Sequence, residues 1–179
     1  MKALLVSLFL TLFLENAMAC MGPVVKGHCI YVKSDLTEAD LSNTNLKSAR
    51  LLRSKLIRAN LSKANLANAD LVEVIATNAD FRYANLSNLT GYDAQLDFAN
   101  LVGANLLRAD LTGASLRNAD LRGANLSFTT LARTDLRGAN LSSANIARAN
   151  FLKATYDDTT VLPFSEKVAA EKFFMQKVR

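Results

Sequence analysis

The stretch LDFANLVGANLLRADLTGASLRNADL, residues 96–121, carries the pattern that decides the fold. A leucine returns at every fifth residue, an alanine stands two places before it, and Asp or Asn usually lies between them. Five residues advance a side chain by about 140° around an α-helix, so these leucines would form no stripe there. On a flat strand the odd spacing would place successive leucines on opposite faces. The chain must therefore bend at every fifth residue.

The same register runs without a slip through 25 pentads, whose central residues extend from Leu36 to Tyr156. In 18 of these pentads an alanine stands two residues before the centre, and in 17 of them Asp or Asn stands one residue before it, which indicates a repeat architecture. Centre and alanine point to one side of a short extended segment, and the other three positions face water. Asp, Asn, Ser and Gly suit the tight turns between segments. We expect corners two residues after a centre, where four glycines stand: Gly103, Gly113, Gly123 and Gly138.

The pentads ADLSN, ANLSK, ADLTG and ADLRG resemble the pentapeptide-repeat family, whose pattern is A-(D/N)-L-x-x. The resemblance covers residues 34–156 and implies an all-β fold, a right-handed four-sided β-helix with four pentads per coil. The 25 pentads then form about six coils, and the rod is roughly 30 Å long at the usual spacing between strands.

Two pentads depart from the pattern, because their centres are the small residues Ala76 and Gly91. Their partners two residues earlier are Val74 and Leu89, so large and small side chains have exchanged places. Such an exchange keeps most of the interior volume, and we predict local repacking. A functional bulge near residues 75 or 90 is the alternative.

The two ends need covers, since an open β-helix exposes its core and its unpaired backbone. We expect an N-terminal cap over residues 20–33 and a C-terminal tail over residues 157–179. Within the tail, Ser165 suits a helix N-cap, and Val168, Ala169 and Phe173 give a short helix an apolar side. This helix is expected to lie on the last coil.

Residues 1–19 have the composition of a secretory signal peptide. Lys2 precedes the twelve-residue apolar run ALLVSLFLTLFL, and Ala17-Met18-Ala19 matches an Ala-x-Ala cleavage pattern. The run is too short to span a bilayer. We therefore expect an exported protein, periplasmic or extracellular.

Cleavage after residue 19 leaves Cys20 at the N-terminus, nine residues before Cys29. In an oxidising compartment the pair favours a disulfide. A lipid on Cys20, as in bacterial lipoproteins, is an alternative, although Ala17 and Met18 depart from the residues usual there. Two free thiols are the third option. Membrane attachment is expected only if Cys20 is lipidated.

The sequence offers no catalytic, metal-binding or cofactor-binding constellation. His28 is the one histidine, so a single chain forms no histidine-based triad and no multi-histidine metal site. The aspartates before the centres are interpreted as corner residues: Asp40, Asp70, Asp110, Asp120 and Asp135. We expect no enzyme and no cofactor.

Two surface features remain as candidate partner surfaces. With twenty residues per coil, one outward column contains Leu52, Val72, Tyr92, Thr112, Ala132 and Leu152, of which only the threonine is polar. We call this column the stripe, and it is typical of a contact surface unless the tail helix or a dimer mate covers it. The second feature is basic: residues 101–153 hold seven Lys or Arg against three Asp, and Arg117, Arg122 and Arg137 are expected on adjacent faces. We call these three arginines the basic patch; it is either an ordinary solvated surface or a site for an anionic ligand.

These observations favour a non-enzymatic scaffold or binding protein of the cell envelope or the exterior. Its partner is an unknown protein or an anionic envelope component, a homodimer is a further option, and no nucleic acid is expected. The resemblance also implies an alternative, since some family members mimic DNA and act on type II topoisomerases. Mimicry needs a strongly negative surface in place of phosphates, whereas this chain has a net charge of +5 and a signal peptide.

Overall fold

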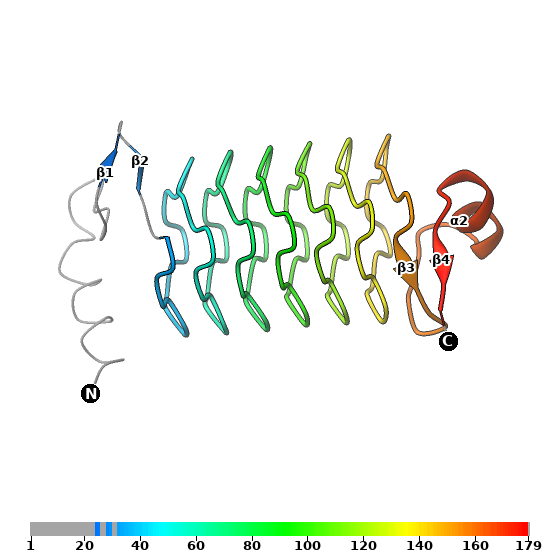
Figure 1. The fold of residues 1–179 in the computed structure, drawn as a ribbon, viewed down its shortest axis with the longest axis horizontal. Coiled ribbons are helices and arrows are strands. Elements are labelled where there is room, and N and C mark those ends of the chain that lie inside the picture. Colours follow the sequence, from blue (N-terminus) through cyan, green and yellow to red (C-terminus); the bar gives the residue numbers. More distant parts are fainter. Residues whose placement is uncertain (1–23, 26–27, 30–31, 179) are drawn as a thin grey trace.

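The computed structural model describes residues 24–25, 28–29 and 32–178 of the 179-residue chain. Regularly stacked coils form a straight rod, and the tail lies at its C-terminal end (Figure 1). The predicted signal peptide and Cys20 lie outside the described residues, so cleavage and the pairing of Cys20 with Cys29 stay predictions.

Each coil contains twenty residues. Isolated parallel bridges join each residue before a centre to the residue twenty positions on, from Asp35 with Lys55 to Asp135 with Thr155. Since a pentad supplies one wall, twenty residues make four walls. The pairing confirms a four-sided β-helix.

A hydrogen-bonded turn forms each corner. At the corner after Leu36 the amide of Ala39 donates to the carbonyl of Leu36 over 3.1 Å, and Glu38 between them has a φ of 60°. A positive φ at the third residue is the conformation of a type II turn, which glycine adopts most easily. The four glycines expected at corners have φ values of 64° to 74°, so this prediction is confirmed. Most other corners hold larger residues at similar angles, including Arg53 and Tyr83.

The aspartates and asparagines before the centres stabilise these corners. The Oδ1 atom of Asp40 accepts the amide of Ser42 over 3.0 Å, and that of Asp110 accepts the amide of Thr112 over 3.1 Å. Asp70, Asp120 and Asp135 make the same bond. The corner interpretation of these five aspartates is confirmed.

The leucine centres and the alanines fill the interior. Around the exchanged pentads Val74 and Ala76 are fully buried, and Leu89 is 3% exposed. A Cβ added at Gly91 would lie 2.9 Å from Cδ1 of Leu89, so the leucine occupies the space that a larger centre would fill.

The ladder continues regularly past both exchanged pentads. Ile75 pairs with Gln95, and Thr90 pairs with Asp110, each at the twenty-residue spacing. The bulge alternative is therefore wrong, and local repacking is confirmed.

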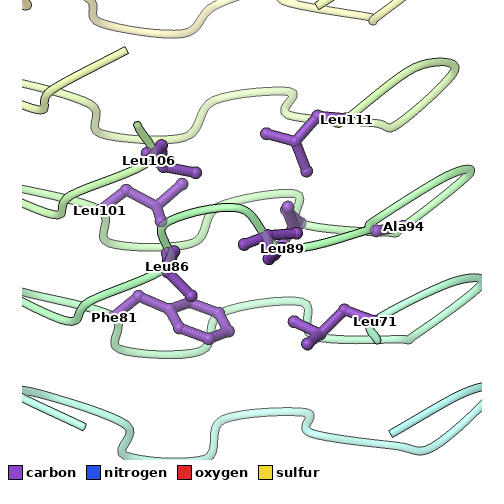
Figure 2. Close-up of a pocket in the computed structure, with 9 residues that line it drawn as sticks. Leu71, Phe81, Leu86, Leu89, Ala94, Leu101, Leu106 and Leu111 are labelled. Carbon is purple, nitrogen blue, oxygen red and sulfur yellow. The ribbon is translucent and has the colours of Figure 1, made fainter. Parts of the chain in front are cut away.

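A small cavity of about 10 Å³ remains beside the second exchange. Figure 2 shows its apolar lining, in which Leu89 and Leu111 face Phe81 and Leu101 across the interior. With no polar partner in this lining, a water molecule would gain nothing there. The cavity is a packing defect of the exchange.

The tail covers part of the C-terminal end of the rod. Strand β3 (Thr155–Tyr156) pairs in parallel with β4 (Gln176–Lys177), and helix α2 (Glu166–Lys172) lies between them in sequence. Ser165 caps α2 by accepting the amide of Val168 over 3.5 Å. Ala169 is fully buried, and the Phe173 ring lies 5.3 Å from that of Phe151 in the last coil. The expected short helix on the last coil is confirmed.

At the other end, β1 (Val24–Val25) and β2 (His28–Cys29) form an antiparallel pair. The rest of the expected N-terminal cap lies largely outside the described residues. Its capping role stays a prediction.

Candidate binding surface

The ladder brings the stripe together as one column. The amide that follows each stripe residue donates to the carbonyl of the next stripe residue: Arg53 to Val72 over 3.0 Å, and Glu73 to Tyr92 over 2.9 Å. Because this bond recurs in every coil, stripe side chains twenty residues apart are neighbours on one outer face. Leu52 and Val72 are half-buried, whereas Tyr92 is 41% and Leu152 46% exposed.

The side chain of Tyr92 makes one polar contact with the described residues. Its hydroxyl donates to Oδ2 of Asp110 over 2.9 Å, and this carboxylate raises the pKa of the phenol above its ordinary value. The bond fixes the ring along the face, so one side of the ring stays open to a partner.

The tail lengthens the stripe and leaves its outer side uncovered along the rod. The amide of Lys153 donates to the carbonyl of Phe174 over 3.1 Å, which is the bond that joins stripe residues elsewhere. Phe174 therefore follows Leu152 in the column, and it is 64% exposed. The sequence could not reveal this position, because the tail leaves the five-residue period and Phe174 follows Leu152 by 22 residues.

The basic patch is less cationic than its composition indicates. Arg122 donates from Nη2 to Asp120 over 2.7 Å, and Arg137 donates from Nη2 to Asp135 over 2.5 Å. Each arginine holds the pKa of its carboxylate below the ordinary range, mainly through these hydrogen bonds. Arg117 makes no ion pair within the described part of the chain; it shares a column with Arg137, and Arg122 lies on the neighbouring face. Two of the three predicted cations are thus neutralised locally.

Two arginines that form no ion pair with any described carboxylate lie at another corner, and the sequence analysis did not identify them. The guanidinium carbons of Arg108 and Arg148 lie 5.7 and 5.3 Å from the ring centroid of Phe128, one on the coil before it and one on the coil after. Phe128 is 44% exposed. These three residues are spaced twenty apart in the sequence, which would have predicted that they stack at one corner.

Other exposed aromatic side chains also stand at corners. Tyr83 is 62% and Phe98 55% exposed, with φ values of 58° and 59°. Each lies on a different edge of the rod from the stripe, so they do not extend it.

Neither a reactive cluster nor a membrane span is found in the described ranges. There, no three His, Cys, Asp or Glu side chains are placed to hold a metal ion. No helix in those ranges is long and apolar enough to cross a bilayer. What the described residues offer is surface for contact.

Comparison with solved structures finds similar rods. The chain is 33% identical to HetL, a pentapeptide repeat protein involved in heterocyst differentiation regulation in the cyanobacterium Nostoc sp. strain PCC 7120, over 75% of this chain and 68% of HetL, with a TM-score of 0.57. It is 22% identical to QnrB1, a plasmid-mediated fluoroquinolone resistance protein, over 84% of this chain and 80% of QnrB1, with a TM-score of 0.58. The second likeness is one of fold alone. None of the curated protein sequences matches the chain.

The family model of pentapeptide repeats matches the chain in eight copies, over residues 34–71, 59–90, 92–127 and 119–155. These matches span more than half of the sequence and coincide with the coils. The chain therefore belongs to the pentapeptide repeat family, whose members form right-handed four-sided β-helices.

Proposed function

We propose that this pentapeptide repeat protein is a non-enzymatic binding protein of the cell envelope or the exterior, and that it acts through the stripe. One observation supports the proposal most: an outward column in which Tyr92, Leu152 and Phe174 remain 41%, 46% and 64% exposed on a rigid face. Apolar side chains gathered on one side of a soluble rod are typical of a contact surface. The partner is a protein with a complementary apolar surface, or a second copy of this chain.

A substitution series at Tyr92 tests the stripe. Tyr92→Asp places a charge where a partner would exclude water, so partner capture by the immobilised protein should be lost. Tyr92→Phe keeps the apolar ring and should retain capture. Tyr83→Asp is the matched control, because it introduces the same charge at another exposed tyrosine away from the stripe. Equal capture by Tyr92→Asp and the unchanged protein would refute the role of the stripe.

Sedimentation distinguishes the two kinds of partner. If the mate is a second copy, the unchanged protein should be dimeric and Tyr92→Asp monomeric. If it is another protein, both should sediment as monomers.

Export rests on residues 1–19 and has a separate test. The protein isolated from its host should begin at Cys20, with a mass lower than the reduced form by two units if a disulfide forms. A large added mass on Cys20 would indicate a lipid instead. A full-length chain retained in the cytoplasm would contradict export while leaving the stripe proposal open to its own test.

DNA mimicry is the weaker candidate. Residues 34–156 hold 14 Lys or Arg and 11 Asp or Glu, so the rod carries no excess of negative charge to imitate phosphates. Asp80, Asp120 and Asp135 are also paired with arginines. Purified protein should leave gyrase supercoiling unchanged, and inhibition at micromolar protein would favour mimicry.

A further inference from the structure

The tail continues the backbone ladder beyond the last coil on only some of the four walls. Beyond the last coil, Val161 pairs with Asn140 on one face, and β4 pairs with β3 on another. Between these pairings the chain leaves the ladder, because Ser165 begins α2 in place of a further wall. The face that ends at Ile146 therefore has no next coil.

The backbone at this place forms an open edge. One coil earlier, Leu126 and Phe128 donate their amides to the carbonyls of residues 145 and 147 over 2.7 and 2.8 Å, and the carbonyl of Ala124 accepts over 2.9 Å. The equivalent amides of Ile146 and Arg148 and the carbonyl of Ala144 pair with no backbone group among the described residues. Such a row of unpaired donors and acceptors is a template for another extended segment.

The core is also less covered at this edge. Ala144 is 9% exposed, compared with 0% for Ala124 one coil earlier, and Ile146 is half-buried where Leu126 is fully buried. Beside the edge lies a groove of about 660 Å³ between residues 146–152 of the last coil and residues 172–174 of the tail. We call it the end groove. Its volume is within the range of ordinary ligand sites.

Charge selects among the ligands that fit the end groove. Arg148 and Lys172 lie in its lining, stacked on the rings of Phe128 and Phe173 at 5.3 and 5.6 Å, and the lining residues include no carboxylate. Neither cation makes an ion pair within the described ranges. A ligand with negative charge on both sides of an apolar centre matches this arrangement.

From the open edge and the end groove together, we infer that the C-terminal end of the rod binds an extended acidic peptide, which adds a wall to the face ending at Ile146. The peptide backbone pairs with the groups of Ala144, Ile146 and Arg148, an apolar side chain covers the exposed core, and acidic side chains face Arg148 and Lys172. A lipid headgroup lacks the alternating donors and acceptors that this edge requires. The end groove borders the stripe at Leu152 and Phe174. The edge groups of Ala144, Ile146 and Arg148 lie on another wall, so the inference does not depend on the proposed function.

Two labelled peptides test the inference on the full chain by fluorescence anisotropy. The probe is Ala-Glu-Leu-Glu-Gly repeated twice, and the comparison peptide replaces each Glu by Lys. The acidic probe should bind at least about tenfold more tightly at low salt, since two cations line the groove. Equal affinity for the two peptides, or no binding of the acidic one, would overturn the inference.

Protein variants locate the binding. The double variant Arg148→Glu with Lys172→Glu should weaken the acidic probe by about tenfold or more, because attraction becomes repulsion. The double variant Lys47→Glu with Lys63→Glu is the matched control, since it changes the net charge by the same amount at two exposed lysines near the other end of the rod. Lys63 also stands at a corner with a φ of 59°, close to the 58° of Arg148. This control should leave the affinity unchanged. Equal losses in both variants would mean a general charge effect and would contradict the site.

Amide hydrogen exchange reports the backbone pairing. The amides of Ile146 and Arg148 should become protected when the acidic probe is added. Protection that appears without the probe and grows with protein concentration would show that a second copy of this chain pairs with the edge. That result would overturn the inference of a peptide ligand. Tight binding without protection of these amides would also count against an added wall.

Discussion

At the scale of single residues, the corners impose a backbone conformation that most side chains resist. Gly103 and Gly123 occupy two stacked corners on the same edge, with φ values of 64° and 65°. A Cβ at Gly103 would lie 2.7 Å from the ring of Tyr83, whereas a Cβ at Gly123 would meet no atom within 4 Å. The two glycines thus share the backbone requirement and differ in the space around them.

This difference predicts unequal costs of alanine. Gly123→Ala should lower the free energy of unfolding by about 1 kcal/mol, through the left-handed backbone alone. Gly103→Ala should cost about 0.5–1.5 kcal/mol more, because the tyrosine ring must leave its rotamer. Urea unfolding measures both variants. In a Tyr83→Ala background the extra cost should vanish, and its persistence would show that the ring is not its source.

The carboxylate of Asp157 joins the last coil to the start of the tail by hydrogen bonds. Its Oδ1 atom accepts the hydroxyls of Thr159 and Thr160 over 2.7 and 3.0 Å and the amide of Gly138 over 3.1 Å. These bonds lower its pKa from 3.8 to about 2, with the Thr159 hydroxyl as the largest cause. The carboxylate therefore binds its proton less readily in the folded chain than in the unfolded one.

A carboxylate whose pKa is lower in the folded chain stabilises the fold at every pH above its pKa in the unfolded chain. This stabilisation is lost as the pH falls through the pKa of the folded chain. The contribution of Asp157 should accordingly be complete near pH 5 and disappear between about pH 4 and pH 2. Unfolding of the unchanged protein and of Asp157→Asn, compared across this range, should show a stability difference that shrinks as the pH falls. A difference that is constant with pH would contradict the assignment.

At the scale of elements, α2 attaches through one small residue. Ala169 is fully buried, while Ala170 beside it is exposed. Ala169→Glu would bury an unpaired charge and should detach the tail while the coils persist. The amides of Gln176 and Val178 donate to the carbonyls of Ala154 and Tyr156 over 2.7 and 2.8 Å, and both amides should then exchange faster. Ala170→Glu is the matched control and should leave their exchange unchanged; equal acceleration would point to helix charge instead of packing.

The same scale shows how far the sequence could predict the structure. The walls and corners were predictable because the residue types in each pentad indicate which positions face inward and which face outward. The path of the tail was not predictable, because it depends on contacts such as that of Phe151 with Phe173. The five-residue repeat carries no information about these contacts. The pairing of Arg122 with Asp120 was predictable, because residues two apart on a wall share one outer face. Counting the charges of the segment did not reveal it.

At the scale of the whole molecule, two surfaces with different physics compete for the role of contact surface. The basic patch attracts through charge, but Asp120 and Asp135 occupy two of its three arginines. The stripe attracts through apolar area, and its two most exposed residues, Leu152 and Phe174, lie at the tail end. Local pairing thus shifts the balance toward the stripe, although the net charge of +5 points to the patch.

The ionic strength separates these two surfaces. Exposed charges are screened beyond about 10 Å at 0.1 M salt, so binding through the basic patch would weaken steeply between about 50 and 200 mM salt. Binding through the stripe should change little over this range, because burial of apolar area does not depend on screening. We expect the captured partner to remain bound at the higher salt and to be lost only with Tyr92→Asp. A partner released by salt but retained by Tyr92→Asp would transfer the function to the face that carries Arg117.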